Sequence, residues 1–239
     1  MTELARQPRA LNELILLLEL NRRIDNEFAS AINLVAVAAV RSDNPEVKTA
    51  LGNVVELLDE HAAVLGSLKV PDDDALIDAA EYLARLCFCM SRSKLDRMNI
   101  HLLFSADTLL LQSDRCWRLG MILYELVTNS ARHAYFEGRK GEVRVELSRE
   151  GTFLKCRVSD NGSVSTRIRP GHGLRILVDL TRSLGGRMHH SIGGAEGGYF
   201  ALDLPFTEHE QRANQETARD SRCSGLEPRL ENVQHSRVA

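Results

Sequence analysis

Two polar side chains lie within an otherwise apolar stretch of the chain, between residues 119 and 134. Glu125 and Asn129 are four residues apart, so on a helix their side chains leave the same face, one turn apart. The apolar residues around them recur at helical spacing: Leu119, Ile122, Leu123, Leu126 and Val127. A carboxylate and a carboxamide on a mostly buried helix are costly unless they bind something. Their oxygens suit a hard cation such as Mg²⁺ that bridges to a nucleotide phosphate, although a solvated polar pair at the helix edge explains this short pattern equally well.

Two glycine-containing segments follow this helix. The first, Arg157-Val158-Ser159-Asp160-Asn161-Gly162, has the composition of a strand that ends in a turn. The second, Gly171-His172-Gly173-Leu174, stands at the start of a new helical pattern that reaches about residue 184. Gly185 and Gly186 then favour a left-handed helix end.

These three boxes, in this order, resemble the nucleotide-binding domain of the GHKL superfamily. That superfamily comprises gyrase-type ATPases, Hsp-type chaperones, mismatch-repair ATPases and histidine kinases. The sequence E-L-V-T-N-S-A-R-H-A, residues 125–134, is most similar to that of bacterial sensor histidine kinases. The resemblance covers roughly residues 10–206, and the three boxes together are specific where each alone is weak.

The resemblance implies a phosphoryl-transfer site that uses ATP and Mg²⁺. Asn129 would be the Mg²⁺ ligand, and Glu125 the nearby carboxylate that assists proton removal from the nucleophile. Asp160 would accept a hydrogen bond from the adenine amino group, and an acceptor-only carboxylate would reject guanine. Gly162 would let the base approach the backbone.

The resemblance also assigns the glycines of the third box to a lid over the phosphates. Gly171 and Gly173 would let this lid fold, with the N-terminus of the following helix facing the phosphate charge. Arg132, His133 and His172 are candidate phosphate neighbours, but a solvated surface role explains each of them equally well.

The glycine boxes depart from the family pattern in two ways. The family's first glycine box often reads Asp-x-Gly-x-Gly, whereas here Val164 occupies the position of the second glycine. Only eight residues, 163–170, separate Gly162 from Gly171. This lid is short, which puts tight closure over ATP in doubt.

The first 70 residues have the pattern of a helical hairpin. One apolar stripe predicts a helix over residues 10–40, and Asp43 or Asn44 can cap a second helix over 46–69, with Pro45 in its first turn. The second helix carries a heptad-like seam: Val47, Leu51, Val54, Leu58, His61, Leu65 and Leu68. Because two helices alone bury little surface, we expect the hairpin to pair with a second copy as a four-helix bundle. The alternative is that the hairpin packs only on its own nucleotide domain.

Histidine kinases carry their phosphoacceptor histidine on the first helix of this hairpin. One subgroup has it in a box of roughly Glu-x-x-His-Arg-x-x-Asn-Glu/Asn, which is similar to residues 19–27 here, with Arg22 at the acceptor position. A guanidinium is protonated at any working pH and is not nucleophilic, so Arg22 cannot accept a phosphoryl group. His61 lies in the seam of the second helix, and we interpret it as a packed histidine rather than a substitute acceptor.

The remaining segments complete an α+β fold class: an N-terminal antiparallel helical hairpin followed by an α/β sandwich. We expect a helix over residues 75–91, capped by the acidic cluster Asp72-Asp73-Asp74. Strands are expected over 100–104, 108–111, 143–147, 153–159, 188–192 and 199–205. The predicted domains are residues 10–70, a dimerisation and phosphotransfer-like hairpin, and 71–206, a GHKL ATP-binding domain. The polar segment 207–239 is expected to be a disordered tail.

Composition narrows the class of protein. The chain has 239 residues and a net charge of −3, which does not point to nucleic acid as a partner. Its apolar runs are too short for a membrane span, and its first residues lack a signal-peptide core, so we expect a cytoplasmic protein. The five cysteines are scattered without zinc spacing and are interpreted as reduced, mostly buried thiols.

Three functional interpretations follow. The leading one is an ATP-binding histidine-kinase core in two-component signalling, a homodimer that docks a response-regulator receiver domain and takes its signal from a separate sensor protein. The second is a pseudokinase or phosphotransfer-type scaffold that docks a response regulator without ATP turnover, favoured by Arg22 and the short lid. The third is an anti-sigma-type serine kinase, which the long hairpin opposes.

Overall fold

The computed structural model describes residues 7–69, 71, 75–136, 140–164, 172–191 and 198–224. The chain divides into two compact units, Met1–Val70 and Pro71–Ala239. None of the helices in these ranges has an apolar stretch long enough to cross a bilayer.

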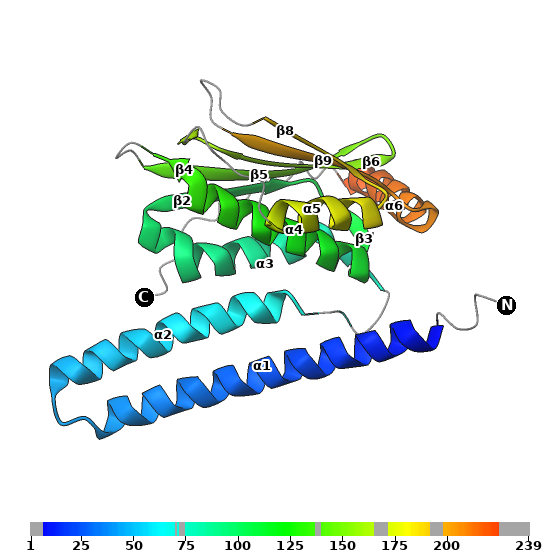
Figure 1. The fold of residues 1–239 in the computed structure, drawn as a ribbon. Helices are drawn as coiled ribbons and strands as arrows, with labels where there is room; N and C mark the ends of the chain where they lie inside the picture. Colours follow the sequence, from blue (N-terminus) through cyan, green and yellow to red (C-terminus); the bar gives the residue numbers. More distant parts are fainter. Residues whose placement is uncertain are drawn as a thin grey trace. The chain divides into compact units, whose positions relative to one another are not determined.

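The first unit is a hairpin of two helices, α1 (Gln7–Arg41) and α2 (Pro45–Ser67) (Figure 1). The Oδ1 atom of Asn44 accepts hydrogen bonds from the backbone N–H groups of Glu46, at 2.9 Å, and Val47, at 3.4 Å. Asn44 is therefore the N-cap of α2, and Pro45 takes the first helical position, where its missing N–H costs nothing. Both helices and the polar break between them were predicted from the sequence.

Most of the apolar side chains of the hairpin remain accessible in the single chain. Only Ala39 and Val64 are buried among the hairpin residues whose exposure is described. Leu34 is 70% exposed and Val40 is 74% exposed, and the seam residues Val47, Val54 and Leu65 are exposed too. His61 is exposed in the single chain as well, and its packing against a second hairpin stays a prediction.

The second unit is built on a five-stranded sheet in the order β2-β5-β6-β9-β8. The strands are β2 (Ile100–Ala106), β5 (Gly141–Glu150), β6 (Phe153–Asp160), β9 (Tyr199–Pro205) and β8 (Arg187–Ser191). β2 pairs with β5 in parallel, and the other neighbours are antiparallel. Two small pairs complete the strands: β1 (Leu76–Asp78) with β3 (Leu110–Gln112), and β4 (Ala134–Tyr135) with β7 (Ser163–Val164).

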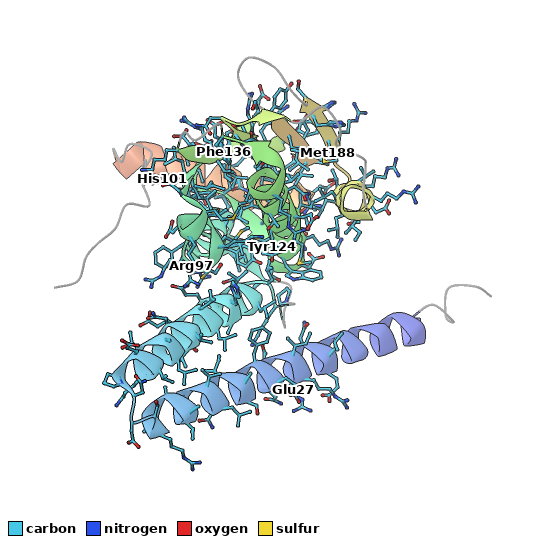
Figure 2. The ribbon with its side chains drawn as sticks, turned by 60° about the vertical axis from the view of Figure 1, so that its left-hand side comes forward. Glu27, Arg97, His101, Tyr124, Phe136 and Met188 are labelled. Atoms are coloured by element: carbon cyan, nitrogen blue, oxygen red, sulfur yellow. The ribbon has the colours of Figure 1, made fainter. Side chains whose placement is uncertain are left out.

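Three helices cover one face of this sheet: α3 (Ala79–Met90), α4 (Ser113–His133) and α5 (His172–Ser183) (Figure 1). A π-helical turn, η1 (Ser91–Leu95), and a 3-10 turn, η2 (Asp96–Met98), link α3 to β2. Figure 2 shows side chains between the layers, with Tyr124 on α4 and Met188 on β8. The predicted two-layer sandwich is therefore confirmed.

The core of the second unit comes from alternation on the strands and from one face of α4. On β5, Val143, Val145 and Leu147 are buried while their neighbours are more exposed. On α4, all five apolar residues that showed helical spacing are fully buried: Leu119, Ile122, Leu123, Leu126 and Val127. Each fully buried side chain of this size contributes roughly 1.5–3 kcal/mol. This burial fixes the rotation of α4 about its axis.

Gly120 lets α4 approach α3 closely. A Cβ atom at this position would lie 2.8 Å from the hydroxyl oxygen of Tyr82 on α3. Real Cβ contacts are never this short, so any larger residue would push the two helices apart. Gly120 is thus required by packing against Tyr82 rather than by backbone conformation.

The helix predicted over residues 75–91 begins later than expected. Residues 76–78 form β1, in which Ile77 pairs with Leu111, and α3 starts at Ala79. The cap is Asp78, whose Oδ1 accepts a 2.8 Å bond from the N–H of Ala80. The pairing with β3 overrides the local helical pattern, and Asp72, Asp73 and Asp74 lie outside the described residues.

The predicted disordered tail is wrong for residues 208–224, which form helix α6 (Glu208–Ser224). The polar composition predicted disorder because this helix is polar along most of its length and packs through few side chains. Two of them, Glu210 and Asn214, are buried, at 0% and 2% exposure. Residues 225–239 lie outside the described part of the chain.

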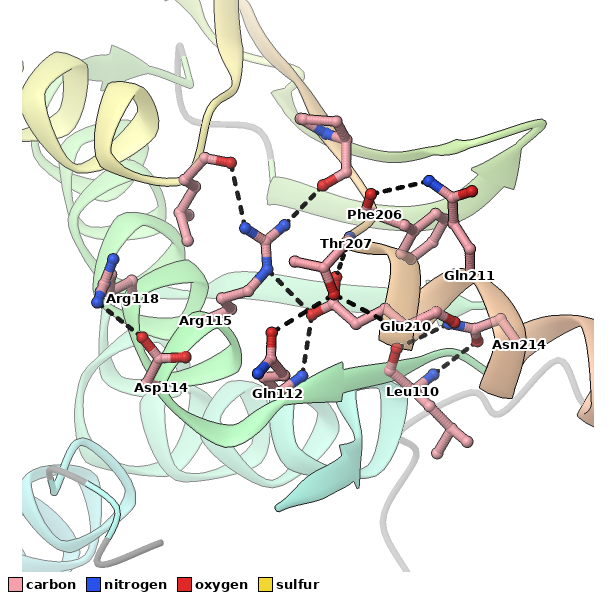
Figure 3. A network of polar contacts seen from close by, with 12 residues as sticks. Leu110, Gln112, Asp114, Arg115, Arg118, Phe206, Thr207, Glu210, Gln211 and Asn214 are labelled. Carbon is pink, nitrogen blue, oxygen red and sulfur yellow. Dashed lines mark hydrogen bonds and ion pairs between the residues drawn. The ribbon is translucent and has the colours of Figure 1, made fainter. Parts of the chain in front are cut away.

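Glu210 and Asn214 attach α6 to the second unit through hydrogen bonds rather than apolar contacts (Figure 3). The Asn214 carboxamide accepts a 2.8 Å bond from the N–H of Leu110 and donates a 2.8 Å bond to its carbonyl oxygen. Glu210 accepts from the N–H of Gln112 at 3.0 Å and from that of Thr207 at 2.8 Å. These bonds satisfy the outer edge of β3, which would otherwise expose unpaired backbone groups.

Candidate nucleotide-binding site

Helix α4 carries the first box in its C-terminal half. Glu125 and Asn129 are half-buried, next to Leu126 and Val127, which are fully buried. The two polar side chains therefore lie at the border between core and solvent, one turn apart on the same face, as predicted. Among the described residues the Asn129 carboxamide has no hydrogen-bond partner, so its oxygen is free to bind a ligand.

Asp160 ends strand β6, and its carboxylate is half-buried. Ser130 on α4 and the backbone of Gly162 and Gly198 all lower its pKa. The Gly162 N–H lies 3.1 Å from Oδ1. The N–H of Asp160 in turn donates a 3.1 Å bond to the carbonyl oxygen of Gly198. Asp160 is therefore held by its own turn and by the residue before β9.

The pKa of the Asp160 carboxyl is raised above its ordinary value of 3.8. Burial is the largest influence and raises the pKa, because a carboxylate loses hydration there. The bonds from Ser130, Gly162 and Gly198 act in the opposite direction. None of these influences is a charged side chain, so burial and hydrogen bonds together set the pKa of Asp160.

The turn after Asp160 is tied to the neighbouring strand. Asn161 Oδ1 accepts a 2.8 Å bond from the N–H of Glu142, and the Asn161 N–H donates a 3.1 Å bond to the carbonyl oxygen of Glu142. Gly162 is buried directly after it. The backbone at the second box is therefore hydrogen-bonded to β5.

The chain just after α4 pairs with the chain just after Gly162. In the β4–β7 pair, Ala134 lies opposite Val164 and Tyr135 opposite Ser163. This pairing brings the first and second boxes side by side. Asn129 and Asp160 are 31 residues apart in the sequence, so only the fold brings them together.

A small charged group lies around Glu125. Lys94, on the π-helical turn η1, is subject to the fields of both Glu125 and Arg132. Burial is the largest influence on Lys94 and lowers its pKa; Arg132 lowers it further and Glu125 opposes the change. π-helical turns often re-aim side chains at functional sites, and this one places a cation near the predicted catalytic carboxylate.

The third box is described only in part. Helix α5 begins at His172, so Gly173 lies in its first turn, whereas Gly171 lies outside the described residues. The side chains of His133 and His172 are likewise not described. The predicted end of α5 is confirmed: Gly185 has φ +70, and the N–H of Gly186 donates to the carbonyl oxygen of Thr181 at 2.9 Å.

An open hollow of about 850 Å³ lies elsewhere, on the sheet face that the helices leave uncovered. Its lining includes Glu146, Lys155 and Asp203. Lys155 Nζ is 2.8 Å from Asp203 Oδ1 and 3.1 Å from Glu150 Oε2, so these charges satisfy one another. None of the predicted site residues lines this hollow, and we assign no nucleotide to it.

The second unit is thus a two-layer sandwich in which α4 packs against β6. Residues 99–193 match the family model described as the histidine kinase-like ATPase domain, so this part of the chain is similar to such domains.

Known relatives are histidine kinases. The chain is 24% identical over 214 residues to the blue-light-activated histidine kinase 2 of Erythrobacter litoralis, covering 85% of this chain and 61% of that protein. It is 29% identical over 164 residues to the sensor histidine kinase PdtaS of Mycobacterium tuberculosis, covering 67% of this chain and 32% of that protein. The chain thus spans less than two thirds of the length of these relatives.

Solved structures show the same fold. The histidine kinase domain of the Erythrobacter litoralis EL346 blue-light-activated histidine kinase superposes with a TM-score of 0.53 at 19% identity, covering 77% of this chain and 98% of that one. At this identity the likeness concerns the fold alone.

Sequence reasoning missed three residues of the site. Ser130 directly follows Asn129, but its partner Asp160 lies on a strand that the helical pattern does not reveal. Gly198 lies between the strands expected over 188–192 and 199–205, where no sequence pattern indicates a role. Lys94 was missed because no sequence pattern indicates the π-helical turn that carries it.

Proposed function

We propose that this chain is the ATP-binding core of a histidine kinase in two-component signalling. The observation that carries the proposal is the pairing of β4 with β7, which joins the chain after α4 to the chain after Gly162 in the part that matches the histidine kinase-like ATPase domain. In this arrangement Asp160 recognises the adenine amino group, and Asn129 lies on the helix that leads into β4.

The donor set around α4 fits Mg²⁺ bound together with a nucleotide. Within the described ranges no three His, Cys, Asp or Glu side chains are grouped to hold a metal ion. Mg²⁺ commonly takes one or two protein oxygens and completes its shell with water and phosphate, for which the free carboxamide oxygen of Asn129 suffices. When bound, the ion would neutralise charge on the transferring phosphate.

The remaining roles are assigned to residues near Glu125. Glu125 orients the nucleophile and takes its proton, with the cations Lys94 and Arg132 nearby. Gly171 and Gly173 give the lid its freedom, with the N-terminus of α5 directed at phosphate.

Arg22 makes self-phosphorylation of the first helix impossible in this proposal. Its guanidinium is exposed and pairs with Glu19, with Nε–Oε2 at 2.8 Å and Nη2–Oε1 at 2.9 Å. Burial does not neutralise this cation, and the ion pair raises its pKa further. The phosphoryl group would therefore go to an acceptor on another chain.

The partners follow from the hairpin. Its exposed apolar side chains, including Leu34 and Val40, fit a homodimer in which two hairpins form a four-helix bundle. A response-regulator receiver domain is the proposed downstream partner, and a separate sensor protein could supply the signal. The scaffold alternative without ATP turnover is not favoured, because the match to the ATPase domain spans the proposed nucleotide site.

Calorimetric titration with Mg-ATP tests the proposal. The wild-type chain is expected to bind saturably, and Asn129→Ala to weaken binding on the order of ten-fold or more, because a charge-assisted contact is lost. Asn53→Ala, at an exposed position of α2, is the matched control and should bind as wild type. Absence of saturable binding by the wild-type chain would contradict the kinase proposal and favour the scaffold.

A further inference from the structure

The rung that follows the last paired residues of β5 and β6 is completed by a side chain. Val143 lies opposite Asp160, and the same register places Glu142 opposite Asn161. Residues that face each other in a hydrogen-bonded antiparallel pair normally exchange two backbone N–H···O=C bonds. The Asn161 N–H makes the first of these, to the carbonyl oxygen of Glu142 at 3.1 Å. The N–H of Glu142, however, donates to the side-chain Oδ1 of Asn161, at 2.8 Å.

The Asn161 carboxamide thus takes the place of its own backbone carbonyl in the ladder. Its Nδ2 atom also donates a 3.3 Å bond to the carbonyl oxygen of Lys140, the residue before β5. Three hydrogen bonds therefore hold Asn161 to this neighbouring segment, and two of them depend on the carboxamide. Because a side chain completes the rung, the backbone can leave the strand direction here while the N–H of Glu142 stays paired.

The change of direction brings the chain back to Asp160. The N–H of Gly162 donates to Asp160 Oδ1 at 3.1 Å, which is the turn in which an Asp side chain bonds the backbone two residues further on. On its other side, the N–H of Asp160 donates to the carbonyl oxygen of Gly198 at 3.1 Å. Asn161 is the residue between Asp160 and Gly162, so its position decides where the Gly162 N–H meets the carboxylate.

We infer that Asn161 is a positioning residue for purine recognition: its carboxamide replaces a backbone rung of the sheet and thereby sets the direction of the Asp160 carboxylate. The role rests on the proposed function, in which Asp160 accepts a hydrogen bond from the adenine amino group. With Oδ1 held by the Gly162 N–H, the remaining lone pairs of the carboxylate have a defined direction, which favours an amino donor there. Without the carboxamide of Asn161 the turn loosens, and this preference weakens.

The test compares two nucleotides that differ only at the recognised group. Mg-ATP and the Mg complex of purine riboside triphosphate, which lacks the 6-amino group, are titrated calorimetrically into each variant. For Asn161→Ala we expect the affinity for ATP to fall about five- to ten-fold, as when the net contribution of one hydrogen bond is lost. Affinity for the analogue should stay within about two-fold, because it offers no amino group to Asp160. An equal loss for both nucleotides, or no loss for either, would overturn the inference.

A second substitution separates the rung from the other bond of the carboxamide. Asn161→Asp keeps an Oδ1 acceptor for the N–H of Glu142 but has no donor for the carbonyl oxygen of Lys140. The added charge acts on both nucleotides alike, so it cancels in the ratio of their affinities. This variant should keep most of the preference for ATP, and loss of the preference as complete as in Asn161→Ala would overturn the inference.

Asp107→Ala is the matched control. Asp107 Oδ2 accepts a 2.9 Å bond from the N–H of Arg149, near the opposite end of β5, and its side chain is exposed like that of Asn161. The substitution removes a similar bond from a side chain to the backbone of the same strand, away from the turn at Gly162. It should leave both affinities unchanged.

A nucleotide-free measurement separates this role from the proposed function. Amide hydrogen exchange, followed by NMR, should be at least about five-fold faster at Glu142 and Gly162 in Asn161→Ala, because local opening exposes these groups. Asp107→Ala should instead speed exchange at Arg149. Unchanged exchange at Gly162 in Asn161→Ala would overturn the inference on its own. A wild-type chain that binds neither nucleotide would refute the proposed function, while the exchange rates would still decide whether Asn161 holds the turn.

Discussion

The Nε atom of Arg115, on α4, lies 2.9 Å from Oε1 of Glu210, on α6, and the Glu210 side chain is fully buried (Figure 3). Arg115 also donates to the carbonyl oxygens of Leu184 at 3.3 Å and Pro205 at 2.7 Å. One guanidinium therefore joins the N-terminal turn of α4, the end of α5, the end of β9 and helix α6. A polar helix that buries little apolar surface is held to the domain by this network.

Removal of one partner of this buried pair should destabilise the second unit strongly. In Glu210→Ala, Arg115 and two backbone N–H groups lose their acceptor, which costs about 3–5 kcal/mol for a broken buried ion pair. Urea unfolding followed by circular dichroism measures the change. Glu208→Ala is the control on the same helix: its carboxylate is exposed and lies 3.6 Å from Arg212, so the change should stay below about 0.5 kcal/mol. Equal effects of the two substitutions would show that α6 does not depend on Glu210.

Helix α6 also shows where sequence reasoning fails. The apolar periodicity of α4 and the alternation of β5 were sufficient to predict both elements, because each buries a continuous face. Residues 208–224 have no such face; their attachment depends on Asn214 and Glu210 meeting β3, about 100 residues earlier in the chain, as the bond separations of 104 and 98 show. Composition cannot reveal a partner at that distance.

The candidate site divides in the same way. Glu125, Asn129 and Asp160 could be found from residue types and spacing, because their boxes are local. Ser130 could not be assigned a role, since the strand that carries Asp160 reaches it only through the packing of α4 on the sheet. Asp78 replaced the predicted caps at residues 72–74 for a related reason: the pairing of β1 with β3 moved the start of the helix.

Asp160→Asn should stabilise the folded chain at neutral pH while it weakens ATP binding. Burial raises the folded-state pKa of Asp160 above 3.8, so ionisation of this group disfavours folding. Its contribution to the free energy of unfolding is therefore most favourable below the unfolded-state pKa and is lost as pH rises through the folded-state pKa. An amide keeps an acceptor oxygen without the charge. The gain in unfolding free energy over wild type should therefore be present at pH 7 and shrink as pH falls toward 3.8.

Urea unfolding of both chains at a series of pH values measures this difference. Asp179→Asn is the control, because Asp179 is exposed on α5 and its substitution should leave the difference small at every pH. A gain that grows as the solution is acidified would contradict the assignment of burial as the dominant influence on Asp160.

Self-association should depend on the exposed apolar face of α1. Leu34 is 70% exposed in the single chain, so Leu34→Glu should not unfold the hairpin, yet a carboxylate buried between two hairpins would be strongly unfavourable. Sedimentation equilibrium should show a wild-type dimer and a dissociation constant at least about ten-fold higher for the variant. Phe153→Glu is the control, since Phe153 is 42% exposed in the second unit; it should leave the dimer intact. A dimer that tolerates Leu34→Glu would place the interface elsewhere.

Arg22→His should restore an acceptor to the first helix. A neutral imidazole is nucleophilic near pH 7, whereas the guanidinium is always protonated. Glu19 remains in place without Arg22 because Arg23 also donates to it, at 2.8 Å, and the Arg22 and Arg23 bonds together lower its pKa to about 2. The carboxylate three residues before the new histidine is therefore ionised at working pH and can orient the ring.

Incubation with radiolabelled Mg-ATP should give acid-labile phosphate on this variant and none on the wild-type chain. Arg22→Gln, neutral but not nucleophilic, should stay unlabelled, and Arg22→His combined with Asn129→Ala should lose the label. Acid-labile phosphate on the wild-type chain would show that another residue accepts the phosphoryl group. Arg22 would then not prevent this chain from being phosphorylated.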